Sequence, residues 1–429
     1  MTTQIILTWY LNEYKIKIIV SKKGDFMMKT YSKLLLFIIC FLCTAQRALI
    51  PEVQLTTPPL FTAYPELAKH IPYVPLGNFP TPLHNAEKLA TSLGIKELFI
   101  KQDNLSGKTL SNNQQLPGGN KVRKLEILLA DAIARNFDTV LTVGPTGSNH
   151  VATTAMYAKE LGLKSIIMLT PQLPTSYTQR NLLLDLYAGA DIHFYQSNAQ
   201  RIIALTKLTR EYNERKINLP YYIPVGGSCE LGCIGFVNAI FELKEQIKKG
   251  LMKEPDYIYV PLGSAGTTAG IILGAMAVQF KCKIIPVQVY FTAKYKTTHL
   301  IELINQTSAY LHSFDPSFPL ITVEEKDLLV NDNFAGEKYA QITPEAANAI
   351  ELLQKYEGIK LDGTYTGKTF AALINEALQG KFKDKTVLFW NTYSSGNYEN
   401  FTSQVNYKNL PKELQYYFTT PLQPLDQGC

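Results

Sequence analysis

The sequence predicts an α/β protein built from mostly parallel, twisted sheets flanked by helices. Strand-like runs at residues 165–169, 284–290 and 387–390 alternate with helical segments, which is typical of parallel sheets covered by helices. Two further runs, 139–143 and 257–260, each enter a loop of small residues and continue into a helix. The 429 residues are enough for one large core or for two domains.

A lysine stands at the predicted start of a helix. Lys121 follows two glycines and Asn120, and apolar residues then recur at helical spacing, at Val122, Leu125, Leu128, Leu129, Ala132 and Ile133. Asn120 is a good N-cap, because its side-chain oxygen can accept from the first free backbone N–H groups. Lys121 would then lie near the positive end of the helix dipole, where an ammonium loses its proton more easily and becomes a nucleophilic amine. For a lysine taken alone, an ordinary solvated side chain is the alternative.

Two other segments join a strand to a helix through small polar residues. In the first, Ser148, Asn149 and His150 precede a predicted helix over 151–161, where backbone N–H groups point at ligands. In the second, uncovered N–H groups and hydroxyls suit a phosphate, and the residues are Gly263, Ser264, Ala265, Gly266 and Thr267. This loop lacks both the lysine of a P-loop and the glycine spacing of a dinucleotide fingerprint. Many strand–helix turns are rich in glycine for packing reasons alone.

Together these segments resemble the pyridoxal phosphate (PLP) enzymes of the tryptophan synthase β-like fold, also called fold type II. Within that fold the chain is most similar to the D-cysteine desulfhydrase and 1-aminocyclopropane-1-carboxylate (ACC) deaminase family. The resemblance covers most of the chain after about residue 65, and the further matching segments are 74–83, 99–107, 223–228, 361–368 and 387–392. It implies two domains, with a small domain at 130–245 inserted into a large one formed by 46–129 and 246–429. PLP is expected in the cleft between them.

The resemblance also implies roles for single residues. Lys121 matches the lysine that forms the Schiff base with PLP, and Asn149 matches the residue that hydrogen-bonds the pyridine 3-oxygen. Ser148 matches a serine beside the substrate carboxylate and Cα that is proposed to assist proton transfer. Tyr365 matches a tyrosine of the substrate pocket, and Thr392 matches the hydroxyl that faces the pyridine nitrogen. The phosphate cup would consist of Gly263, Ser264, Ala265, Gly266 and Thr267.

Some of these assignments leave alternatives open. His150 would bind the substrate carboxylate or shuttle a proton, and a capping or packing histidine is equally expected. Tyr365 is one of 25 tyrosines and could be a buried packing residue. Ala265 replaces a glycine of the family's phosphate cup. The polar stretch 108–117 is longer than the family loop and could reshape the substrate pocket, and 391–396 departs from the family's glycine-rich segment.

Two threonines favour β-elimination over ring opening. In the deaminase pattern the position after the pocket tyrosine is acidic, whereas here it is Thr366, as in the desulfhydrases. A neutral Thr392 at the ring nitrogen would weaken the electron sink, which suits loss of a thiolate better than opening of a cyclopropane. The sequence therefore predicts a D-cysteine desulfhydrase, which converts D-cysteine to pyruvate, ammonia and hydrogen sulfide. The alternatives are ACC deaminase and a non-catalytic exported protein that binds an amino acid or PLP.

The N-terminus has the pattern of a secretory signal peptide over residues 27–45, within an N-terminal extension of residues 1–45. A short basic segment precedes ten unbroken apolar residues, 34–43, and small residues follow. The run is too short to span a bilayer. We therefore expect export to the periplasm or the medium. An extension that stays attached, and a cytoplasmic protein as is usual in the family, are the alternatives.

Charge and cysteines give weaker indications. Residues 1–45 contribute +4 to the net charge of +6, so a processed chain at +2 gives no reason to expect nucleic acid or anionic membranes as partners. Cys229 and Cys233 would lie one helical turn apart, and they would pair in an exported protein or, as we favour, be small buried apolar residues. No His or Cys spacing indicates a zinc site. The resemblance implies a homodimer that acts on a small amino acid.

Overall fold

The computed structural model describes residues 5–11, 14–20, 57–215, 218–290 and 295–426. The chain divides into two compact units, residues 1–56 and 57–429. In the first unit, β1 (Ile5–Leu11) and β2 (Tyr14–Val20) pair antiparallel. The predicted signal peptide at 27–45 lies outside the described residues. All the predicted site residues belong to the second unit.

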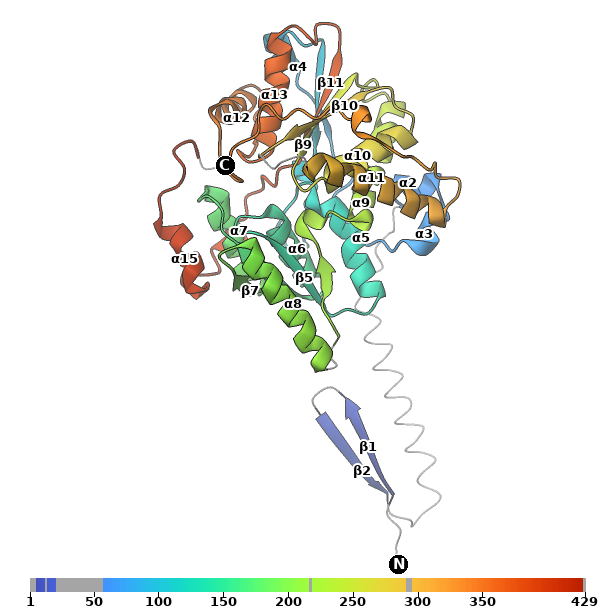
Figure 1. Cartoon of the computed structure of the whole chain (residues 1–429), viewed down its shortest axis with the longest axis vertical. Coiled ribbons are helices and arrows are strands. Elements are labelled where there is room, and N and C mark those ends of the chain that lie inside the picture. Colours follow the sequence, from blue (N-terminus) through green and yellow to red (C-terminus); the bar gives the residue numbers. More distant parts are fainter. Residues whose placement is uncertain (1–4, 12–13, 21–56, 216–217, 291–294, 427–429) are drawn as a thin grey trace, which may run out of the picture. The chain divides into compact units, whose positions relative to one another are not determined.

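A five-stranded sheet forms one half of the second unit (Figure 1). Its order is β10-β9-β11-β4-β3, in which only the edge strand β3 is antiparallel to its neighbour. The strands are β3 (Leu83–Asn85), β4 (Glu97–Gln102), β9 (Tyr257–Leu262), β10 (Lys283–Gln288) and β11 (Thr386–Asn391). Along β11, Val387 and Phe389 enter one apolar core while Leu388 and Trp390 enter another. This alternation shows that the sheet is buried on both faces, as parallel sheets are.

Helices supply the two cores of this sheet. One face packs against α4 (Glu87–Leu93), α12 (Pro344–Glu357) and α13 (Thr366–Leu378). The other packs against α2 (Pro59–Ala63), α3 (Leu67–His70), α9 (Glu230–Lys248), α10 (Gly266–Ala277) and α11 (Tyr295–Phe314). Figure 1 shows the two groups of helices on opposite sides of the strands.

A second sheet of four parallel strands has the order β7-β6-β5-β8. The strands are β5 (Thr139–Pro145), β6 (Lys164–Thr170), β7 (Asp191–Phe194) and β8 (Tyr221–Ile223). Val140 of β5 packs with residues of α5 (Lys121–Ala134) and α6 (Asn149–Glu160), whereas Leu141 and Val143 face α8 (Asn198–Glu214). Further helices on this half are α7 (Ser176–Ala188), α14 (Glu399–Thr402) and α15 (Lys412–Thr419). Short 3-10 turns occupy Asp103–Leu105, Val225–Gly227, Glu325–Asp327 and Tyr407–Asn409.

The predicted fold class, mostly parallel sheets flanked by helices, is confirmed. All four strands of the second sheet lie within the range 130–245 that the resemblance implied for a small domain. Residues 130 and 245 themselves fall inside α5 and α9, which continue through them. The exact division into two domains stays a prediction.

A buried ionic cluster fixes α5 to its surroundings. The Arg123 guanidinium, 1% exposed, donates to Asp103 Oδ1 at 2.8 Å and to Glu242 Oε2 of α9 at 2.9 Å. Lys101 Nζ of β4 adds a 2.6 Å contact to Glu242 Oε1, and the Phe79 ring lies 4.2 Å from the guanidinium carbon. Buried charges are tolerated when they are paired and hydrogen-bonded in this way. The cluster therefore fixes how α5 is oriented about its axis.

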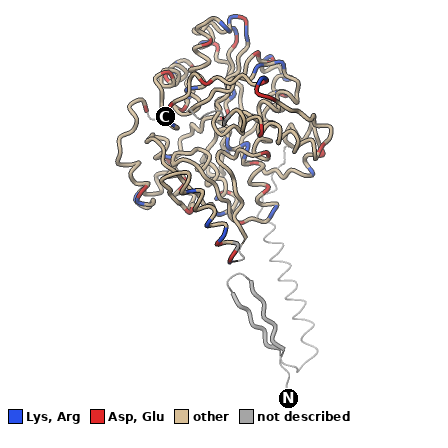
Figure 2. The backbone as a smooth tube through the Cα atoms, in the orientation of Figure 1, with Lys and Arg blue, Asp and Glu red and all other residues tan. Residues whose placement is uncertain are grey.

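Three smaller predictions also have outcomes. Cys229 and Cys233 are both free thiols, and Cys233 is fully buried in the apolar core, so the packing interpretation is confirmed. None of the helices in the described part of the chain has both the length and the apolar character needed to cross a bilayer. Figure 2 shows basic and acidic residues interspersed along the described backbone.

Candidate active site

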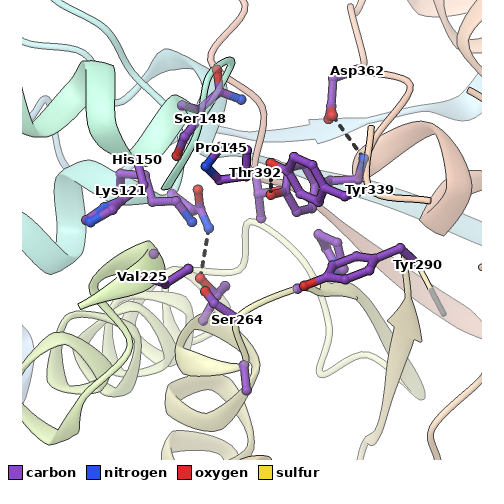
Figure 3. A pocket seen from close by; sticks show the side chains of 18 of the residues that line it. Lys121, Pro145, Ser148, His150, Val225, Ser264, Tyr290, Tyr339, Asp362 and Thr392 are labelled. Carbon is purple, nitrogen blue, oxygen red and sulfur yellow. Dashed lines mark hydrogen bonds between the residues drawn. The ribbon is translucent and has the colours of Figure 1, made fainter. Parts of the chain in front are cut away.

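A cavity of about 600 Å³ lies where the carboxyl ends of strands from both sheets converge (Figure 3). The last residues of β5 and β6 line it, as do the loops that follow β9 and β11. In α/β proteins this is the usual place for a ligand. Every predicted site residue except Gly266 lines it, and those residues are Lys121, Ser148, Asn149, His150, Gly263, Ser264, Ala265, Thr267, Tyr365 and Thr392.

Lys121 is the first residue of α5 and is half-buried. Burial lowers the pKa of its ammonium well below the ordinary value, the nearby Lys124 lowers it further, and the Asp362 carboxylate opposes both effects. Burial therefore favours the uncharged amine, which is the form that attacks a carbonyl. The helix start and the nucleophilic lysine were both predicted from the sequence, and the structure places that lysine in the cavity wall.

Asn120 corrects one prediction. Its side chain does not cap α5, because its backbone is already helical at φ −60° and ψ −17°. The amide Nδ2 instead donates to Thr267 Oγ1 at 2.8 Å. Asn120 therefore ties the start of the lysine-bearing helix to the first turn of α10.

Ser148 and Asn149 form the start of α6. Ser148 is its N-cap, and the hydroxyl Oγ accepts from Val151 N at 3.3 Å. Asn149 Oδ1 accepts from Asn181 Nδ2 at 2.8 Å and from Arg180 Nη2 at 3.4 Å. Because the oxygen is occupied, the amide Nδ2 is left to donate into the cavity. A hydrogen-bond donor is what the predicted contact to an anionic ring oxygen requires.

His150 is a buried, neutral ring. Nε2 lies 3.0 Å from Thr142 Oγ1, and Nδ1 has no hydrogen-bond partner among the described residues. Burial lowers the pKa of the imidazole well below its ordinary value, and Lys121 and Lys124 lower it further. A neutral imidazole cannot form an ion pair with a carboxylate, so the structure favours packing or hydrogen bonding for this residue.

The predicted phosphate cup is the amino end of α10. The N–H groups of Thr267 and Thr268 have no acceptor in the described part of the chain, as expected for the first turn of a helix. Ser264 Oγ lies 2.8 Å from Ser228 Oγ. Gly266 does not line the cavity, and its N–H donates to Ser228 Oγ at 3.1 Å.

Ala265 adopts the conformation that glycine would favour. As the N-cap of α10 it has φ +71° and ψ −28°, in the left-handed region. A residue with a Cβ pays roughly 1–2 kcal/mol there. The replacement of the family's glycine therefore keeps the loop conformation at the cost of some backbone strain.

Lys124 is a site residue that the sequence interpretation missed. It lies one turn after Lys121, is fully buried, and donates from Nζ to Gly226 O at 2.9 Å and to Ser228 Oγ at 3.3 Å. A Cβ added at Gly266 would lie 2.7 Å from that Nζ, so the amine is directly behind the cup. Burial lowers its pKa to about 8. Its spacing of three from Lys121 was the signal that could have revealed it.

Two tyrosines, Tyr339 and Tyr365, also line the cavity. Tyr365 Oη and Tyr339 Oη are 2.7 Å apart, and burial raises the pKa of both phenols, so both remain protonated at neutral pH. Tyr339 belongs to a loop that carries no motif and was not predicted. Gln423 anchors this loop, because Gln423 Nε2 donates to Ala340 O at 2.9 Å and Ile342 N donates to Gln423 Oε1 at 3.2 Å.

The Asp362 carboxylate acts electrostatically on Lys121, but its hydrogen bonds go to the residues that lead into α13. Its two oxygens accept four hydrogen bonds, from the backbone N–H groups of Thr364, Tyr365 and Thr366 and from Thr366 Oγ1. Thr366 is fully buried in this cap and does not line the cavity. Thr392 does line it, directly after β11, and its hydroxyl has no partner among the described residues.

The insertion at 108–117 does not reshape the cavity. It folds back on itself as a small hairpin, with Leu110 N donating to Gln114 O and Leu116 N donating to Lys108 O. Lys108 Nζ contacts Glu160 Oε1 on the surface at 2.7 Å. None of the ten residues lines the cavity. The expected effect on the substrate pocket is therefore not seen, because the hairpin extends outward.

Comparison with known proteins assigns the family. The model of a family described as pyridoxal-phosphate dependent enzyme matches residues 74–392. The chain belongs to this PLP-dependent enzyme family. The match includes every residue predicted for the site, so the resemblance deduced from the motifs is confirmed.

Three relatives of this PLP-dependent enzyme are similar over most of their length. A Pyrococcus abyssi protein, provisionally named a 1-aminocyclopropane-1-carboxylate deaminase, is 31% identical over 327 residues, or 76% of this chain and 92% of that protein. A D-cysteine desulfhydrase of Klebsiella pneumoniae is 32% identical over 333 residues, or 75% and 93%. The crystal structure of an ACC deaminase homologue matches with a TM-score of 0.66 and 30% identity, covering 84% of this chain and 100% of that one.

The cavity fits the cofactor that the family implies. An aldehyde requires an uncharged amine, which Lys121 supplies. A phosphate requires hydroxyl and N–H donors, which Ser264 and the first turn of α10 supply, with the buried amine of Lys124 behind them. A ring oxygen requires a donor such as Asn149 Nδ2. These groups come from separate elements and converge on one space, so the enzyme would hold PLP here.

Proposed function

We propose that this PLP-dependent enzyme catalyses β-elimination on a small amino acid, with D-cysteine as the first candidate and pyruvate, ammonia and sulfide as the products. The observation that carries the proposal is that the Asp362 carboxylate is fully engaged in hydrogen bonds. Among the described residues that line the cavity it is the only acid, and its two oxygens accept four hydrogen bonds from Thr364, Tyr365 and Thr366, which lead into α13.

The absence of a free acid among these lining residues favours elimination. A carboxylate beside a pyridine nitrogen would hold a proton there and strengthen electron withdrawal, which opening a cyclopropane demands. The neutral hydroxyl of Thr392 would do so far less. Loss of a thiolate from Cβ needs less electron withdrawal. The D-cysteine desulfhydrase relative supports the same reaction, and the deaminase relatives keep ACC as the alternative.

When bound, PLP supplies the electron sink for the pair released from Cα. The chain's own residues would do the rest. The N–H groups at the start of α6, beside Ser148, would hold the substrate carboxylate. Lys121 Nζ would accept the Cα proton, because burial lowers the pKa of its ammonium and favours the uncharged amine. Tyr365 and Tyr339 stay protonated and would donate to the departing group. The half-enclosed cavity would limit attack by water.

The test uses the full chain with PLP. Sulfide and pyruvate are assayed with D-cysteine, and 2-oxobutyrate with ACC, alongside a Lys121→Ala variant. We expect both products from D-cysteine, none from ACC, and loss of turnover and of the visible absorption of the lysine-bound cofactor in the variant. Turnover of ACC alone would replace the proposal by its alternative. Retention of turnover in Lys121→Ala would refute the assigned nucleophile.

The non-catalytic alternative loses one of its two supports, the other being the unusual segment 391–396. It rested in part on the unusual 108–117 segment, and that hairpin lies outside the cavity. An enzyme that binds PLP yet releases no product from any β-substituted amino acid would restore this alternative.

We also propose that the chain is exported and works as a homodimer. The support for export is the sequence pattern at 27–45, and the support for a dimer is the family resemblance. Mass spectrometry of the protein from its native host should find an N-terminus near residue 46. An intact N-terminus in a cytoplasmic fraction would refute export. Sedimentation should give twice the monomer mass, and a single copy would refute the dimer.

A further inference from the structure

One charged residue in the cavity has no role in the chemistry proposed so far. Of the described lining residues, three carry charged groups, namely Lys121, Arg201 and Asp362. Lys121 is the nucleophile, and Asp362 is occupied by the first turn of α13. Arg201 remains. In Figure 3 the labelled residues Lys121, Ser148 and Ser264 lie around the cavity. Arg201 also lines it and belongs to α8.

Arg201 is held over the cavity by a helix that is itself anchored. It lies one turn into α8, and Asn198 and Ile202 line the cavity beside it. The spacing of three and four residues places them on one face of the helix. That face continues into Leu205 and Leu208, which pack against β5 and β6. The position of Arg201 therefore follows from the packing of α8 on the second sheet.

The guanidinium of Arg201 has no counter-ion within the described chain. It is half-buried, burial lowers its pKa, and only the Tyr222 phenol opposes that effect. No described carboxylate forms an ion pair with it, in contrast to Arg123, which has two. A partly desolvated cation with no partner is unfavourable unless a ligand supplies the opposite charge.

We infer that Arg201 binds an anionic group carried on Cβ of the substrate, so that this enzyme, besides D-cysteine, also acts on amino acids whose leaving group is a phosphate ester. The inference rests on the proposed β-elimination and names its substrate class. The α-carboxylate of the substrate is already provided for at the start of α6, where the Asn149 and His150 N–H groups have no acceptor among the described residues. The cofactor phosphate is provided for at the start of α10, so Arg201 is left for an anion elsewhere on the substrate.

The reaction balances without an added oxidant or reductant. The Cα–H bond breaks and its proton goes to Lys121 Nζ. The electron pair of the Cα–H bond forms the Cα–Cβ double bond while the Cβ–O bond of a phosphoserine breaks, and phosphate leaves with the electron pair of that Cβ–O bond. The released 2-aminoacrylate takes up water and gives pyruvate and ammonium. Arg201 would neutralise the anionic group in the bound state and as it departs.

The experiment compares two substrates that differ in the charge of the leaving group. The full chain with PLP is assayed for pyruvate with O-phosphoserine and with β-chloroalanine, each as both enantiomers. In Arg201→Gln we expect kcat/KM for O-phosphoserine to fall about tenfold to a hundredfold, as for loss of a charge-assisted hydrogen bond, with little change for β-chloroalanine. Arg201→Lys should restore part of the loss. Arg210→Gln is the matched control, since Arg210 lies on the same helix and is exposed.

Each other outcome has a definite meaning. An equal loss for both substrates would assign Arg201 to the shared α-carboxylate and overturn the inference. Turnover of β-chloroalanine without turnover of O-phosphoserine by the unmodified enzyme would overturn the inference and leave the proposed elimination standing. No pyruvate from either substrate, with the cofactor absorption present, would overturn the proposed function and the inference with it.

Discussion

The buried amine of Lys124 offers a quantitative test of the cofactor site. Its pKa of about 8, against an ordinary 10.5, reflects the loss of water around a fully buried ammonium. In cofactor-free protein at pH 7 this corresponds to about 3 kcal/mol of destabilisation, since each unit of pKa is worth about 1.4 kcal/mol. A phosphate bound at the first turn of α10, in front of this amine, would offset part of that penalty through its negative charge.

The sign follows from proton linkage. The folded-state pKa lies below the unfolded-state pKa, so the penalty is complete below about pH 8 and disappears as the pH rises toward 10.5. Lys124→Met removes the titrating group at similar volume. Relative to that variant, the cofactor-free wild-type chain should gain about 2 kcal/mol of stability between pH 7 and pH 9.5. The lost hydrogen bond to Gly226 O changes the stability of the variant similarly at both pH values, so it cancels in the difference.

The assay combines urea unfolding of the cofactor-free full chain at the two pH values with a PLP titration. We expect Lys124→Met to bind PLP about tenfold to a hundredfold more weakly, as for loss of a charge-assisted contact. Lys248→Met, at an exposed lysine of α9, should change neither quantity. A stability difference that is independent of pH, together with unchanged PLP affinity, would refute the assignment of Lys124 to the phosphate.

Three further substitutions test separate parts of the site. Ala265→Gly should change stability by less than about 1 kcal/mol and keep PLP binding, because relief of the left-handed strain is offset by the freer unfolded chain; urea unfolding measures it, and a loss above 2 kcal/mol would contradict the strain argument. Gln423→Ala should raise KM several-fold at nearly constant kcat, since it removes the hydrogen bonds that anchor the loop carrying Tyr339. Steady-state kinetics measure this, and an unchanged KM would show that the loop keeps its position without Gln423. Asn181→Leu should weaken PLP binding by leaving the Asn149 oxygen without its best donor, and an unchanged cofactor spectrum and affinity would count against that orientation.

The sequence predicted best where the information was local. The apolar spacing after Lys121 located α5, and the small residues after two strands located the starts of α6 and α10. Each of these features depends on residues within one turn of the position in question. For that reason the amine, the α6 donors and most of the cup were named correctly as lining one cavity.

What the sequence could not predict depends on tertiary contacts. Tyr339 and Arg201 reach the cavity from a loop and a helix that carry no motif, and only packing brings them there. Asn120 shows the opposite case, because a good capping residue found a better partner in Thr267 of a distant helix. Thr366 distinguished the desulfhydrase pattern from the deaminase pattern in the sequence, and only the structure shows that its hydroxyl bonds to Asp362 at the start of α13.

The way α5 is held has a consequence for how the enzyme keeps its cofactor. Lys121 lines the cavity and Lys124 lies behind the phosphate cup, while Arg123 between them forms ion pairs with Asp103 and Glu242. A helix turns about 100° per residue, so any rotation or shift of α5 would break the ion pairs of Arg123 and move Lys121 out of the cavity at the same time. The amide hydrogens of this helix should therefore exchange with deuterium only when the whole unit unfolds. Release of the cofactor would then require hydrolysis of its bond to Lys121 and would not occur through local unfolding of α5.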